Sequence, residues 1–123
     1  NPGRAWMDIE LVPLAFQLGG RFRESVLSLL RTAQIMLGEL PGIYTRMSLW
    51  NRWVGRVSWK LEGLAVPDLW TADYGTDGLG GGITGPRWVD PKTWPQGWKR
   101  WQITDKGKVP GFSSGIDISL ERV

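Results

Sequence analysis

Apolar residues recur at helical spacing over one long stretch of the chain. From Phe22 to Leu40 they return every three or four residues, with polar and charged residues between them. Pro41 follows, and proline cannot continue a helix. The pattern therefore predicts an amphipathic helix over 22–40. Its inward face would consist of Val26, Leu30, Ala33 and Leu37.

The next segment, 48–62, supports two interpretations. Its apolar residues also follow helical spacing, and Gly63 before an apolar residue resembles the end of a helix. Residues 57–61, however, alternate between apolar and polar as in a half-buried strand, and Gly55 weakens a helix. We favour a helix because its spacing agrees with a stop signal, and a strand is the alternative.

The C-terminal half shows little periodicity. Residues 74–86 are rich in glycine and have no hydrophobic period, which predicts a long loop that needs support from other groups. At the end of the chain, Ile116, Ile118 and Leu120 alternate with polar residues, a pattern typical of a short strand.

These elements predict a single small α+β domain of low regular content. The N-terminal half would hold one or two amphipathic helices, and an extended Gly/Pro/Trp-rich C-terminal half would end in a short strand. The expected parts are an N-terminal arm over 1–20, a helical part over 21–66 and a loop-rich part over 67–123.

The composition argues against most catalytic chemistry. The 123 residues include nine tryptophans but neither histidine nor cysteine. The chain therefore lacks the usual ligands of zinc, haem and iron–sulfur clusters, and it lacks the residues of Ser/His/Asp and Cys/His catalysis. We expect no enzyme activity, no metal and no cofactor, with a lipid or pigment held by contact alone as an open alternative.

Basic residues and tryptophans gather in two clusters, the first over 52–60 and the second over 98–101. Fifteen Lys and Arg against twelve Asp and Glu give a net charge of +3, which is unevenly spread. In the helical interpretation of 48–62, Trp59 points outward among cations spaced four residues apart. Such clusters suit protein interfaces, anionic membrane surfaces and nucleic acids. The predicted partner-contact residues are Arg52, Arg56, Trp59, Lys60, Trp98, Lys99, Arg100 and Trp101.

Acidic residues near tryptophans suggest a carbohydrate site as a weaker hypothesis. Carbohydrate sites combine carboxylates with aromatic faces, and glycosidases place two carboxylates around the bond that they cleave. The carboxylates in question are Asp68, Asp73, Asp77 and Asp90. Their spacing within a loop fixes no geometry, and Asp90 before Pro91 is explained more simply as a helix cap.

We therefore expect a non-catalytic accessory or structural subunit of a larger, membrane-associated assembly, such as a respiratory or photosynthetic complex. Other protein subunits would be its main partners, with a membrane surface as a further one. The alternatives are a nucleic-acid-binding subunit of a ribonucleoprotein, a carbohydrate-binding module and a viral structural protein. The compartment is not determined, although an organelle fits, and the start at Asn1 without methionine suggests a processed N-terminus.

Overall fold

The computed structural model describes residues 4–107 and 116–122, so the expected processing at Asn1 lies outside the described residues. It contains few helices and one mixed sheet of five strands, which confirms the expected α+β character and low regular content. The elements in chain order are β1 (Trp6–Ile9), α1 (Leu14–Gly19), α2 (Phe22–Leu37), β2 (Gly42–Thr45), α3 (Met47–Trp53), β3 (Leu69–Ala72), β4 (Arg100–Gly107) and β5 (Ile116–Glu121).

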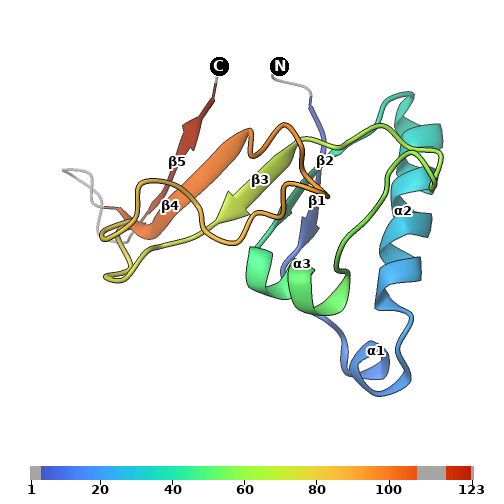
Figure 1. Cartoon of the computed structure of the whole chain (residues 1–123), viewed down its shortest axis with the longest axis horizontal. Coiled ribbons are helices and arrows are strands. Elements are labelled where there is room, and N and C mark those ends of the chain that lie inside the picture. The colour runs from blue at the N-terminus through green and yellow to red at the C-terminus, as the bar shows by residue number, and fades with distance from the viewer. Residues whose placement is uncertain (1–3, 108–115, 123) are drawn as a thin grey trace.

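The strands lie side by side in chain order (Figure 1). Strands β1 to β4 are parallel, and β5 is antiparallel to β4. Parallel strands direct their carboxyl ends toward the same edge of a sheet. Asp8, Tyr44 and Trp70 occupy one row across β1, β2 and β3, so their side chains project from the same face.

The first twenty residues do not form the arm that the sequence suggests. Trp6–Ile9 is strand β1, which pairs with β2, and Leu14–Gly19 is helix α1. Among the described strands β2 is the one partner of β1, so the other edge of β1 is open. The N-terminal segment is thus an integral part of the sheet.

Helices α2 and α3 lie against one face of the sheet (Figure 1). Ile43 of β2 and Leu69 of β3 are fully buried there, together with Leu30 of α2. Removing such side chains from water is the main favourable contribution to folding. The apolar core therefore lies between the helices and the central strands.

Three tryptophans complete this core. The ring centroids of Trp50 in α3, Trp59 and Trp94 lie 5.2 to 6.1 Å from one another. The indole N–H of Trp59 donates a hydrogen bond to the carbonyl of Thr93 at 2.8 Å. Because Trp94 belongs to the long connection between β3 and β4, this packing attaches that connection to α3. The expected outward position of Trp59 is wrong, since the side chain is buried.

The helix predicted over 48–62 is wrong beyond its first turns, because α3 ends at Trp53. Gly55 has a φ of 80°, in the left-handed region that glycine adopts at little cost, and the chain leaves the helical path there. The strand alternative is also wrong, because 59–63 forms turns. The N–H of Leu64 donates to the carbonyl of Trp59 at 2.9 Å, so the predicted stop signal closes a single turn.

The helix predicted over 22–40 is confirmed as α2, which ends at Leu37. Val26 and Leu30 are buried as expected, whereas Leu37 is 52% exposed. Ile35 and Met36 are also exposed near the end of α2. The apolar face of this helix is therefore covered in its first half only.

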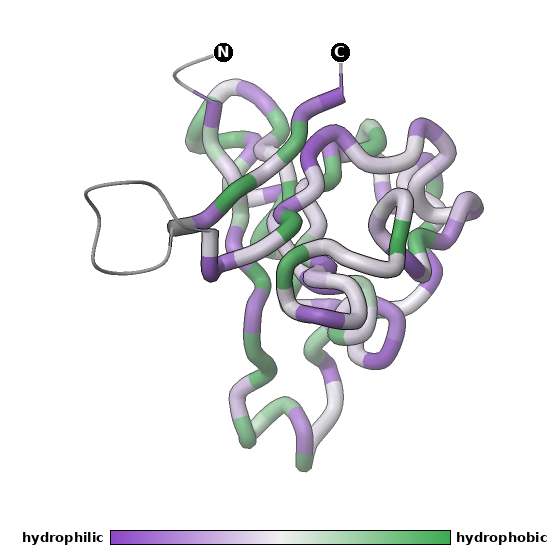
Figure 2. The backbone as a smooth tube through the Cα atoms, turned by 90° about the vertical axis from the view of Figure 1, so that its left-hand side faces the viewer, coloured by the Kyte–Doolittle hydropathy of each residue, from purple (hydrophilic) through white to green (hydrophobic). Residues whose placement is uncertain are grey.

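Helix α1 adds to the exposed apolar surface. Leu14 and Leu18 are exposed on it, and Figure 2 shows apolar positions in the segment that extends at the lower end of the molecule. A groove of about 350 Å³ beside β1 is lined by Phe16 of α1 and Val26 of α2. In the described part of the chain, every helix is too short or too polar to cross a membrane.

We expect Leu30→Asp to lower the free energy of unfolding by at least about 4 kcal/mol, because it buries a carboxylate without a partner. Urea unfolding followed by circular dichroism measures this change. Leu29→Asp is the matched control, because Leu29 is 55% exposed on the same helix and its replacement should cost little. Equal stability of the two variants would contradict the assignment of the buried face.

Candidate functional site

Polar side chains gather where the parallel strands end. Asp8 and Glu10 lie at the carboxyl end of β1, Tyr44 and Arg46 at that of β2, and Tyr74 follows β3. Residues two positions apart on a strand project to the same face, so Asp8 and Glu10 are neighbours. In open sheets of parallel strands, ligands bind at this edge. These five side chains define the carboxyl-edge site.

Tyr44 is the hydrogen-bonding centre of the carboxyl-edge site. Its hydroxyl donates to the Oε1 atom of Gln102 on β4, and the side chain of Glu10 lies near enough to affect its pKa. Burial raises the pKa of Tyr44 far above its ordinary value, and the charges of Tyr74 and Glu10 add to this rise. Tyr44 therefore stays protonated and acts as a neutral hydrogen-bond donor.

Asp8 and Glu10 form a coupled carboxyl pair. Asp8 is accessible to solvent, yet its partial burial raises its pKa, as do the charge of Glu10 and a hydrogen bond with that side chain. The raised pKa lets Asp8 keep its proton to a higher pH than a free aspartate, so the pair contains a group able to act as a general acid.

Charged side chains from the other strands affect the carboxyl-edge site. The guanidinium of Arg46 lies 4.7 Å from the ring centroid of Tyr74. Burial raises the pKa of Tyr74; Arg46 opposes the rise, whereas the carboxylates of Asp105 and Asp117 on β4 and β5 contribute to it. Groups on or next to all five strands thus influence the carboxyl-edge site. Among the described residues, no group of three or more acidic side chains is placed to hold a metal ion.

A buried ion pair fixes the chain beyond β3. Asp73 is 7% exposed and accepts hydrogen bonds from the backbone N–H, Nε and Nη2 of Arg87 at 2.8 to 2.9 Å. Burial alone would raise the pKa of Asp73, but these hydrogen bonds, one from the N–H of Gly75 and the charge of Arg87 lower it overall. The two ends of the glycine-rich loop are therefore tied together.

The glycine-rich loop has no regular element, as expected, but its support comes from within the chain. The carboxylate of Asp77 accepts the N–H groups of Leu79 and Gly81, and the hydroxyl of Thr104 on β4 donates to the carbonyl of Gly78 at 2.7 Å. A side chain at position 80 would collide with Ile103. Close packing against β4 thus requires glycine there.

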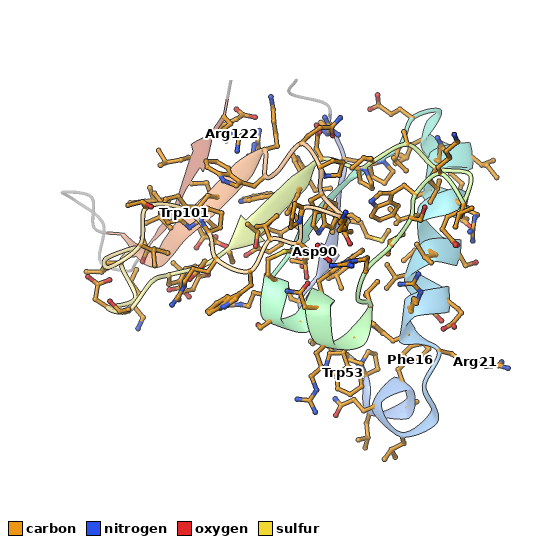
Figure 3. The ribbon with its side chains drawn as sticks, in the orientation of Figure 1. Phe16, Arg21, Trp53, Asp90, Trp101 and Arg122 are labelled. Carbon is orange, nitrogen blue, oxygen red and sulfur yellow. The ribbon has the colours of Figure 1, made fainter. Side chains whose placement is uncertain are left out.

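The four carboxylates considered from sequence do not form one site. Asp68 pairs with Arg4 at 2.6 Å near the start of β3, and Asp90, labelled beside α3 in Figure 3, pairs with Arg56 at 2.9 Å. Asp73 and Asp77 organise the glycine-rich loop. All four therefore have structural partners.

The predictions from sequence do not single out the carboxyl pair of Asp8 and Glu10 at the carboxyl ends of the strands. Assigning 1–20 to an arm removed Asp8 and Glu10 from consideration. The available signal was two carboxylates two residues apart, directly after the apolar Trp6 and Met7. This is the pattern of a strand with acidic groups at its end.

The first cluster of predicted contact residues, over 52–60, combines exposed and buried side chains. Arg52 lies with its guanidinium 4.9 Å from the ring centroid of Trp53, Arg56 is held by Asp90, and Lys60 is exposed. Trp59 is in the core. Burial removes Trp59 from the predicted contact surface, whereas the three basic side chains remain exposed.

The second cluster is divided as well. Trp101, labelled on β4 in Figure 3, is buried, and its indole N–H donates to the carbonyl of Asp73 at 2.8 Å. Trp98 is half-buried. Lys99 and Arg100 line a cavity of about 400 Å³ near the starts of the parallel strands, at the edge opposite the carboxyl-edge site.

Comparison with known proteins finds a similar fold among the solved structures. No protein-family model and no curated protein sequence matches the chain. Among solved structures, the chain is similar to the catalytic domain of endolysin ply40 from bacteriophage P40 of Listeria monocytogenes, with a TM-score of 0.65 and 21% sequence identity. The match covers 95% of this chain and 48% of that chain, so the chain spans about half the length of the domain that it resembles.

This likeness contradicts the hypothesis of a non-catalytic, membrane-associated accessory subunit, because the chain is similar in fold to about half of an endolysin catalytic domain. The expected absence of enzyme activity rested on the lack of histidine and cysteine. Carboxyl groups alone suffice for acid and base catalysis when their environments separate their pKa values. The irregular C-terminal half, expected to be extended, packs on its own sheet.

We expect Arg87→Leu to lower the free energy of unfolding at pH 7 by about 2–3 kcal/mol, because it leaves the Asp73 carboxylate buried without its charged partner. The cost is below that of a fully enclosed pair, since the Arg87 side chain is 35% exposed. The lowered pKa of Asp73 makes its contribution present above pH 4 and lost as the pH falls through that pKa. Urea unfolding at pH 7 and pH 3 should therefore show a smaller difference at pH 3.

Arg56→Leu is the matched control for Arg87→Leu. Arg56 also pairs with an aspartate, but its side chain is 67% exposed. Such surface pairs contribute little to stability, because solvent screens the two charges. If both variants lose the same stability, the Arg87–Asp73 pair is not the buried constraint described above.

Proposed function

We propose that the chain forms part of the catalytic domain of a cell-wall hydrolase that cleaves glycosidic bonds. The observation that carries this proposal is the coupled carboxyl pair of Asp8 and Glu10 at the edge of the sheet where ligands bind. The likeness to an endolysin catalytic domain supports it and suggests the bacterial cell wall as the source of substrate.

The chemistry follows from two carboxyl groups in different protonation states. In glycoside hydrolysis, one carboxyl group donates a proton to the oxygen of the leaving sugar, and the other, as a carboxylate, activates water or attacks the sugar carbon. The raised pKa of Asp8 keeps a proton on the pair at a pH where a free aspartate has lost it. Neutral Tyr44 would donate a hydrogen bond to the carboxylate or to the substrate.

The open side of the sheet is consistent with a larger domain. The exposed edge of β1 and the apolar groove beside it are surfaces that folded domains usually cover. The resembling catalytic domain is about twice as long as this match. We infer that further polypeptide covers this side in the active enzyme, so the assay uses the protein that contains the chain.

We expect Asp8→Asn and Glu10→Gln each to lower kcat by about 10²–10⁴, because each removes a group that transfers or stabilises charge in the reaction. Release of reducing sugar from purified bacterial cell walls measures the rate. Activity of the parent should fall as the pH rises through the raised pKa of Asp8, because the acid then loses its proton.

Asp68→Asn is the control for these variants, because Asp68 pairs with Arg4 away from the carboxyl edge. It should retain the parent rate. Undiminished sugar release by both Asp8→Asn and Glu10→Gln would rule out the carboxyl pair as the catalytic group.

A further inference from the structure

Trp88 combines two unusual properties. Its side chain is 60% exposed, and its φ is 69°, in the left-handed region that side chains other than those of glycine, asparagine and aspartate seldom adopt. Among the described residues other than glycine, Arg21 is the one further case of positive φ. A bulky aromatic residue in this conformation stores strain, and such strain concentrates at ligand-binding positions.

The surroundings of Trp88 hold it in this conformation. The carbonyl of Trp88 accepts a hydrogen bond from Nδ2 of Asn51 at 2.9 Å, which attaches it to α3. The preceding Arg87 is fixed by the buried Asp73, and its guanidinium lies 4.3 Å from the ring centroid of Trp88. The ring is thus held in place although most of it faces solvent.

Trp88 is adjacent to the carboxyl-edge site. Together with Arg46 and Tyr74, it lines a cavity of about 180 Å³ at the carboxyl ends of β2 and β3. Arg46 and Tyr74 are themselves members of the site, through their electrostatic coupling to Tyr44. A ligand that reaches Asp8 and Glu10 along this edge would therefore pass the exposed face of the indole ring.

We propose that Trp88 is the platform on which one sugar ring of the glycan stacks beside the carboxyl pair. The inference rests on the proposed glycoside hydrolysis and specifies where the substrate is held. A pyranose ring presents a face of C–H groups that matches the flat, electron-rich face of an indole in size and polarity. Stacking would remove from water the exposed aromatic surface of Trp88. The fold maintains the position of this ring at a cost in backbone strain.

The test separates binding from stability with the substitution Trp88→Gly. Glycine adopts a φ of 69° without strain, so the melting temperature should stay unchanged or rise. The affinity for a soluble oligomer of N-acetylglucosamine should fall about tenfold, as expected for the loss of one aromatic stack. Calorimetric titration measures it in the background of Glu10→Gln, so that hydrolysis does not interfere.

Leu79→Gly is the matched control, because Leu79 is 56% exposed on the same loop but does not line the cavity. It should leave the affinity unchanged. Trp88→Asn, whose side chain also tolerates left-handed backbone, provides a second variant if the first does not fold.

Each outcome decides the inference. Loss of affinity in Trp88→Gly with retained melting temperature supports the platform, and it does so even if the parent protein proves unable to hydrolyse cell walls, an outcome that would remove only the proposed activity. Equal affinity of Trp88→Gly and its parent overturns the platform, as does the absence of oligosaccharide binding by the parent. A melting temperature several degrees lower in both Trp88 variants would also overturn it, by showing that the indole is a structural group.

Discussion

The mutual packing of Trp50, Trp59 and Trp94 is the interaction on which the rest of the structure depends. These side chains come from α3, from the turn after it and from the long connection between β3 and β4. Nearly thirty residues without helix or strand could not hold one conformation without such an anchor, because their backbone entropy opposes order. Each indole supplies a large buried area from a single residue. A tryptophan-rich composition thus compensates for low regular content.

Once this connection is anchored, its remaining constraints become effective. The pair of Asp73 and Arg87 ties the two ends of the glycine-rich loop, and the hydrogen bond from Asn51 attaches the following residue to α3. Trp88 is held in a strained conformation because the preceding Arg87 and its own carbonyl are both fixed. Packing in the core thus helps to fix the conformation of Trp88 at the edge of the sheet where ligands are expected.

The parallel arrangement of β1 to β4 makes that edge a meeting point. Asp8, Tyr44 and Gln102 lie on three different strands, far apart in the chain, yet each points to the same face near the carboxyl ends. Burial and the charge of Glu10 raise the pKa of Asp8 there. The arrangement brings two carboxyl groups together at one edge without histidine, a feature that composition alone does not reveal.

The sequence by itself determined the features that depend on local periodicity and turn chemistry. Helix α2, strand β5 and the stop signal at Gly63 could all be predicted, because helical spacing, alternation and glycine conformation act over a few residues. Only the tertiary structure decided that Trp59 is buried and that Asp8 and Glu10 end a strand of the sheet. A four-residue parallel strand carries little pattern of its own, and its formation depends on partners that lie more than thirty residues away in the chain.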